Sequence, residues 1–176
     1  KGKEVKLFSK ILNRLNNKNY DSIPGNYKII SQGGGKDAIP HFALLSSDDK
    51  KEYIIWVRGT RFSDPNDIWI NMMTNPIDFY QGQCHRGYAN AAMGIIELIK
   101  NHLEIASFDK IVCLGHSLGG AVSSVIATIL TKGDFGFVQN INSLKEKFKN
   151  RIRALVFGTP PVFTKSIIQE SKTFIV

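Results

Sequence analysis

The chain has 176 residues, enough for one domain with a hydrophobic core of its own. Hydrophobic residues make up 43% and charged residues 22%, a balance that excludes a disordered or fibrous chain. No apolar run reaches the roughly 18 residues that a membrane-spanning helix needs. A net charge of +8 is typical of nucleic-acid-binding proteins, but here the basic residues are scattered and no nucleic-acid-binding motif accompanies them. An anionic lipid surface fits this charge better if the chemistry is lipid chemistry.

Residues 1–20 contain an amphipathic helix. Its apolar positions recur at spacings of three and four: Val5, Phe8, Leu12 and Leu15. Basic residues recur every four positions on another face: Lys6, Lys10, Arg14 and Lys18. Two interpretations follow, a helix docked on the domain with a solvated basic face, or a helix that lies on a membrane surface.

Short apolar runs bounded by turn residues come next and are typical of strands. They cover residues 26–31, 41–45 and 52–57, and the last two flank the polar turn SSDDKK as a hairpin. The run QGGGK, at 32–36, lacks the spacing of a phosphate-binding loop and a following helix pattern. We therefore interpret it as a flexible turn. Residues 61–87 are polar and turn-rich, with Pro65 and Pro76, yet they carry several large apolar side chains.

From Tyr88 onwards helices alternate with short buried strands. The expected helices cover 88–105, 118–130, a short lysine-rich part of 134–150, and 163–171, and the expected strands cover 111–114, 154–157 and 173–176. This alternation predicts an α/β fold with a mostly parallel sheet, flanking helices and an N-terminal antiparallel hairpin. We find no repeat and no linker, so residues 1–176 are treated as a single domain.

The strand at 111–114 leads directly into Gly115-His116-Ser117-Leu118-Gly119, and a helix follows. A Gly-x-Ser-x-Gly turn between a buried strand and a helix is the nucleophile elbow, in which Ser117 is the nucleophile. Gly115 and Gly119 allow a turn too tight for side chains at those positions. The backbone N–H of Leu118, at the start of the helix, is then one donor to an oxyanion. Such a site uses no metal and no cofactor.

Five segments, in this order, resemble the class 3 (fungal-type) lipase family, which includes sn-1-specific diacylglycerol lipases. They are IIWVRGT (54–60), DIWINM (67–72), CHRGYANAA (84–92), GHSLGGAVSSV (115–125) and FGTPPV (157–162), the last with Pro161 where arginine is common. The resemblance implies an α/β-hydrolase fold and hydrolysis of acyl esters of glycerolipids, tri- or diacylglycerol, through an acyl-enzyme on Ser117. It also implies that Thr60 is the oxyanion-hole residue contributed by the earlier strand.

For such an enzyme, residues 61–83 are a candidate lid because they carry more apolar side chains than a plain loop needs. The residues that suggest it are Trp69, Ile70, Met72 and Met73. The alternative is that several of them simply pack on the sheet.

No histidine follows Ser117, although the triad of this fold runs Ser, Asp or Glu, then His. We expect His116 to pack in the sheet, because neighbouring residues of an elbow point apart. The resemblance implies a structural role for His85, with a surrogate base as the alternative. The acid and the histidine of the triad are expected beyond Val176, which would make these residues an incomplete domain, truncated before the last strands and weakly active alone.

Two other classes of function stay open. One is a non-catalytic hydrolase-fold module that binds lipid or a protein, and the other is an acyltransferase or thioesterase using the same serine.

Cys84 and Cys113 are too few for a disulfide scaffold, and we expect Cys113 to be a buried free thiol. No N-glycosylation sequon occurs, which leans towards an intracellular location, with peripheral membrane association if the substrate is lipid. The sequence leaves the oligomeric state open.

Overall fold

The computed structural model describes residues 2–21, 23–60, 65–105, 107–108, 110–163 and 173–175, without the side chains of residues 66, 69, 72 and 173–175. The helices are α1 (Gly2–Asn16), α2 (Pro65–Met72), α3 (Arg86–Ile105), α4 (Leu118–Lys132) and α5 (Asn142–Lys147). The strands are β1 (Lys28–Gly33), β2 (Phe42–Ser47), β3 (Glu52–Val57), β4 (Pro76–Phe79), β5 (Gly82–His85), β6 (Lys110–His116), β7 (Ile152–Phe157) and β8 (Thr173–Ile175).

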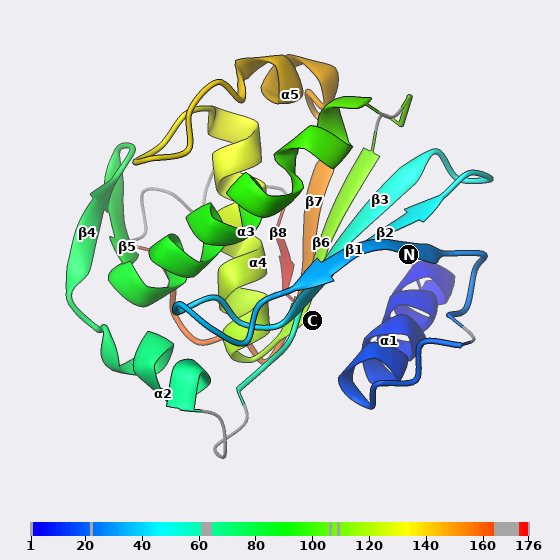
Figure 1. The fold of residues 1–176 in the computed structure, drawn as a ribbon, viewed down its shortest axis with the longest axis horizontal. Coiled ribbons are helices and arrows are strands. Elements are labelled where there is room, and N and C mark those ends of the chain that lie inside the picture. Colours follow the sequence, from blue (N-terminus) through cyan, green and yellow to red (C-terminus); the bar gives the residue numbers. More distant parts are fainter. Residues whose placement is uncertain are drawn as a thin grey trace.

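One sheet organises the described residues, with the strand order β1-β2-β3-β6-β7-β8. The first three strands pair antiparallel, and β3, β6, β7 and β8 pair parallel. Figure 1 shows α1 against one face of the sheet, with α3 and α4 against the other. The predicted α/β fold, with a mostly parallel sheet, flanking helices and antiparallel N-terminal strands, is confirmed.

The central strands are apolar along most of their length because both of their faces are covered. Side chains alternate between faces along a strand, so Tyr53 and Ile55 of β3 join the core beneath α3 and α4. Their neighbours Ile54 and Trp56 join the core beneath α1. A continuous run such as EYIIWV is what a strand buried on both faces requires.

Regular elements occur within the turn-rich segment 61–87. The described part of this segment contains α2 and a separate antiparallel hairpin, β4–β5. The two prolines do not prevent this, because Pro65 stands in the first turn of a helix and Pro76 at the start of a strand. Phe79 anchors the hairpin, since its fully buried ring packs on Phe135 with centroids 4.5 Å apart. Residues 61–64 lie outside the described residues, as does nearly all of the helix expected at 163–171.

Helix α1 docks on the sheet through its apolar side. Its buried side chains are Phe8, Ile11, Leu12 and Leu15. This supports the interpretation of a docked helix with a solvated basic face, because the apolar side is not available for insertion into a membrane. The helix ends at Asn16, so Lys18 is not part of its basic face. No helix among the described residues is long and apolar enough to cross a membrane.

Candidate active site

The carboxyl ends of the central parallel strands meet at one edge of the sheet. Val57 of β3 pairs with Gly115 of β6, and His116 of β6 pairs with Phe157 of β7. The segments that follow these three strands therefore converge, although they are far apart in the sequence. In open α/β sheets this is the edge at which ligands bind.

Ser117 occupies the tight turn between β6 and α4. Its φ of 54° and ψ of −126° lie where residues other than glycine are rarely found, so the backbone is strained. The Ser117 N–H donates to the carbonyl of Phe157 at 2.9 Å, which ties the turn to the neighbouring strand. The Ser117 side chain makes no capping hydrogen bond to α4. This backbone conformation is that of a nucleophile elbow.

Two glycines make the turn sterically feasible. A Cβ on Gly115 would collide with the carbonyl of Gly119, and a Cβ on Gly119 would collide with the carbonyl of Val57. Both obstacles are backbone atoms, so no rotamer change relieves them. The glycines at these two positions let α4 start directly above the ends of β3 and β6.

Leu118 is the first residue of α4 and only 1% exposed. The N–H of Ala121 donates to the carbonyl of Ser117 at 3.0 Å, so the helical hydrogen bonds begin there. The N–H groups of the preceding turn have no partner within the helix. Together with the positive end of the helix dipole they favour a negatively charged oxygen. The N–H of Leu118 belongs to this first turn, and its role as an oxyanion donor stays a prediction.

Thr60 follows β3 at the same edge, and side chains from α2 and α3 hold it. The Nδ2 of Asn71 donates to the Oγ1 of Thr60 at 3.1 Å, and the Tyr88 hydroxyl donates to the Oδ1 of Asn71 at 3.3 Å. The ring of His85 stacks on Tyr88, with centroids 4.0 Å apart and an interplanar angle of 18°. Residues that begin α3 therefore orient the predicted oxyanion residue through Asn71.

His85 is part of the group of side chains that positions Thr60, since its ring stacks on Tyr88. Burial lowers the pKa of its imidazole, and a hydrogen bond to the backbone of Asn71 opposes that shift. A neutral imidazole packed on Tyr88 and bonded to Asn71 fits the structural role expected for His85. No local sequence pattern marks Asn71 or Tyr88 as a site residue. The only signal was their presence inside the segments that resemble the lipase family.

A buried ion pair links the end of β3 to α2. The Nη2 of Arg58 lies 3.0 Å from the Oδ2 of Asp67, and the two side chains are 8% and 0% exposed. Arg58 stands two residues before Thr60, and Asp67 four residues before Asn71. The pair therefore fixes the distance between the strand end and the helix that supports Thr60. No local pattern in the sequence indicated that these two charges meet.

The candidate lid residues lie on or next to α2. Ile70 is fully buried and belongs to the core in this structure, whereas Met73 is half-buried. The carbonyl of Met73 accepts a hydrogen bond from the N–H of Gly87 at 3.3 Å. The side chains of Trp69 and Met72 lie outside the described residues. The lid stays a prediction, and opening it by moving α2 would break the buried ion pair between β3 and α2.

The prediction that His116 packs in the sheet is wrong, because its side chain is exposed. As the last residue of β6 it points to the same face as Val112 and Leu114, the face on which α1 docks. It borders a cavity of about 430 Å³. The other lining residues all belong to α1: Ser9, Lys10, Leu12, Asn13 and Asn16. Within the described part of the chain, no group of three or more His, Cys, Asp or Glu residues could hold a metal ion.

The sheet and the strained serine turn at its carboxyl edge define an α/β hydrolase. A family profile described as lipase (class 3) matches residues 54–173, more than half of the chain. The chain belongs to the class 3 lipase family. The curated proteins include no sequence that matches it.

Solved structures share the fold. A lipase from Rhizopus microsporus var. chinensis superposes with a TM-score of 0.71 and 15% identity, over 98% of this chain and 65% of that one. The triacylglyceride lipase of Rhizomucor miehei gives 0.69 and 16%, over 98% and 70%. A triacylglycerol lipase from Penicillium expansum gives 0.64 and 14%, over 98% and 66%. The chain spans about two thirds of the length of these enzymes, and at such identities the likeness shows the fold alone.

Proposed function

We propose that this chain carries the nucleophile and oxyanion hole of a serine lipase that hydrolyses acyl esters of glycerolipids, tri- or diacylglycerol. The observation that carries the proposal is the strained conformation of Ser117 at the N-terminus of α4, at the edge where Thr60 also lies. Membership of the class 3 lipase family supports the choice of a lipid ester as substrate.

The proposed reaction has two stages. The Oγ of Ser117 attacks the ester carbonyl carbon and loses its proton to a base, and the resulting oxyanion accepts hydrogen bonds from Thr60 and the N–H of Leu118. The tetrahedral intermediate then expels the glycerolipid alcohol, which takes up the proton and leaves an acyl-enzyme. In the second stage water attacks the acyl-enzyme, releases the fatty acid and restores the hydroxyl.

We further propose that the base and the acid that orients it come from chain beyond Val176. The order of the triad in this fold requires both to follow the nucleophile, and no histidine does. Among the three later acids, Asp134 accepts a hydrogen bond from the N–H of Ile141 at 2.9 Å, and Glu146 is exposed beside Lys149. Both are engaged in the connection before β7, and Glu170 lies outside the described residues.

A fluorophosphonate probe tests the nucleophile directly. The chain of 176 residues should label slowly and at Ser117 alone, as found by mass spectrometry of its peptides. Ser117→Ala should abolish the label, and Ser9→Ala, which removes an exposed hydroxyl of α1, should leave it unchanged. Labelling at any other serine, or none in a longer chain that contains a downstream Asp and His, would refute the assignment and favour a non-catalytic module.

Hydrolysis of 4-nitrophenyl butyrate tests the position of the base. Without a base the serine is a weak nucleophile at neutral pH, so the chain of 176 residues should hydrolyse this ester very slowly. A longer chain that supplies the histidine should be faster by several orders of magnitude. Lipase-like turnover by the 176 residues alone, lost in Ser117→Ala, would show that the base lies within them.

A further inference from the structure

The outward face of α1 carries positive charge only. Four exposed side chains, here called the basic stripe, fall within about 80° of the helix circumference at about 100° per residue. They are Lys3, Lys6, Lys10 and Arg14. The stripe is about 16 Å long at 1.5 Å of rise per residue, and it lies opposite the buried apolar side of the helix.

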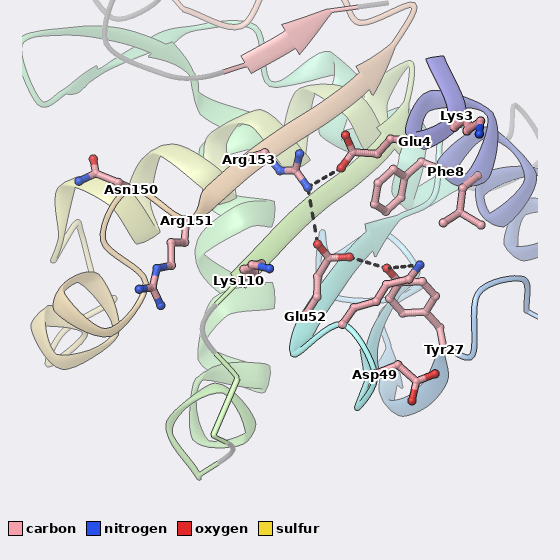
Figure 2. Close-up of a pocket in the computed structure, with 12 residues that line it drawn as sticks. Lys3, Glu4, Phe8, Tyr27, Asp49, Glu52, Lys110, Asn150, Arg151 and Arg153 are labelled. Atoms are coloured by element: carbon pink, nitrogen blue, oxygen red, sulfur yellow. Dashed lines mark hydrogen bonds and ion pairs between the residues drawn. The ribbon is translucent and has the colours of Figure 1, made fainter. Parts of the chain in front are cut away.

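The single acidic residue of α1 is turned away from the stripe. Glu4 reaches inward to Arg153 of β7, with Oε1 to Nη2 at 2.7 Å, and the same Nη2 lies 3.6 Å from Glu52. Figure 2 shows Glu4 and Glu52 pointing towards Arg153 from two sides, with Tyr27 in turn bonded to Glu52. This network clamps the first turn of α1 to the sheet. It also removes the one negative charge that could neutralise the stripe.

A cavity lies at each end of the basic stripe. At its N-terminal end Lys3 lines a cavity of about 850 Å³ whose lining carries both further basic residues, such as Lys110, and the carboxylates of Asp49 and Glu52. At the other end Lys10 lines the smaller cavity beside His116, the residue before Ser117. The stripe therefore runs along the molecule towards the edge that holds the nucleophile.

We propose that the basic stripe of α1 adsorbs to an anionic lipid bilayer and holds the catalytic edge beside that surface. The choice of a bilayer over a nucleic acid rests on the proposed glycerolipid substrate. A straight row of unpaired cations on a rigid helix suits a flat, negatively charged surface. Binding is electrostatic and needs no insertion, because the apolar side of α1 is buried against the sheet.

Co-sedimentation with lipid vesicles at low ionic strength tests this surface. The chain should sediment with vesicles of phosphatidylcholine mixed with phosphatidylserine and not with phosphatidylcholine alone, and salt should release it. The triple variant K6Q/K10Q/R14Q should weaken the partition by about 100-fold, since each basic residue near an anionic surface strengthens it about fivefold. The matched control is the triple variant K100Q/K145Q/K149Q. It removes three lysines that lie on or next to α3 and α5, on the other side of the sheet from α1.

Three outcomes would overturn the proposal. They are equal losses in the two triple variants, equal binding to vesicles without phosphatidylserine, and tighter binding of a single-stranded oligonucleotide than of the anionic vesicles. Circular dichroism of both variants establishes that they are folded. The assay contains no ester hydrolysis, so Ser117→Ala should bind vesicles as the unaltered chain does. A failed lipase assignment and a failed membrane surface therefore give different results.

Discussion

Replacing Asp67 by asparagine removes the charge that faces Arg58 at 3.0 Å inside the protein. The two side chains, Asp67 and Arg58, are 0% and 8% exposed, so water does not screen the loss of this ion pair. Breaking a buried pair from one side costs about 3–5 kcal/mol. The amide of asparagine still accepts a hydrogen bond, so we expect the lower end, about 3 kcal/mol of the free energy of unfolding. In a domain of this size that loss lowers the melting temperature by about 6–12 °C.

Urea unfolding followed by circular dichroism at pH 7 measures the loss. The matched control is Glu146→Gln, which breaks an exposed pair with Lys149 at 3.6 Å between side chains 65% and 68% exposed. This control should cost less than about 1 kcal/mol, because water screens such pairs. The double variant R58M/D67L should be more stable than D67N, because it removes both buried charges together. Equal losses in D67N and E146Q would refute the role of the buried pair.

Three further outcomes are expected. Gly115→Ala should prevent labelling of the nucleophile, because its Cβ meets backbone, whereas Gly2→Ala meets no atom within 4 Å and should be silent. Asn71→Leu removes the donor to the Thr60 hydroxyl and should slow fluorophosphonate labelling by up to about 100-fold, the cost of a misplacement of about 1 Å, and an unchanged rate would contradict this role. Burial raises the pKa of the Cys84 thiol from 9.0 to about 12, so the unfolded chain loses this proton first and stability should fall from about pH 9 to pH 12. Iodoacetamide at pH 9 should therefore modify Cys84 in urea and spare it in the native protein, and equal rates would contradict its burial.

The sequence by itself determined the class of fold and the place of the tight turn that carries Ser117. Both rest on local patterns, the apolar runs of β3, β6 and β7 alternating with helix periodicity, and two glycines around Ser117. A strand buried on both faces requires a short apolar run, and a turn too tight for a Cβ requires glycine, so a few consecutive residues suffice to indicate each. The order of five short segments then sufficed to indicate the lipase family.

Only the tertiary structure decided which side chains meet around the candidate site. The contacts of Asn71 with Thr60 and of Asp67 with Arg58 join segments whose meeting depends on where α2 packs. The exposure of His116 depends on how α1 docks on that face of the sheet, since a cavity separates the two. The periodicity of a single segment specifies its own faces and not the partner opposite each face. Strand order and helix docking are properties of the whole chain, and they bring these residues together.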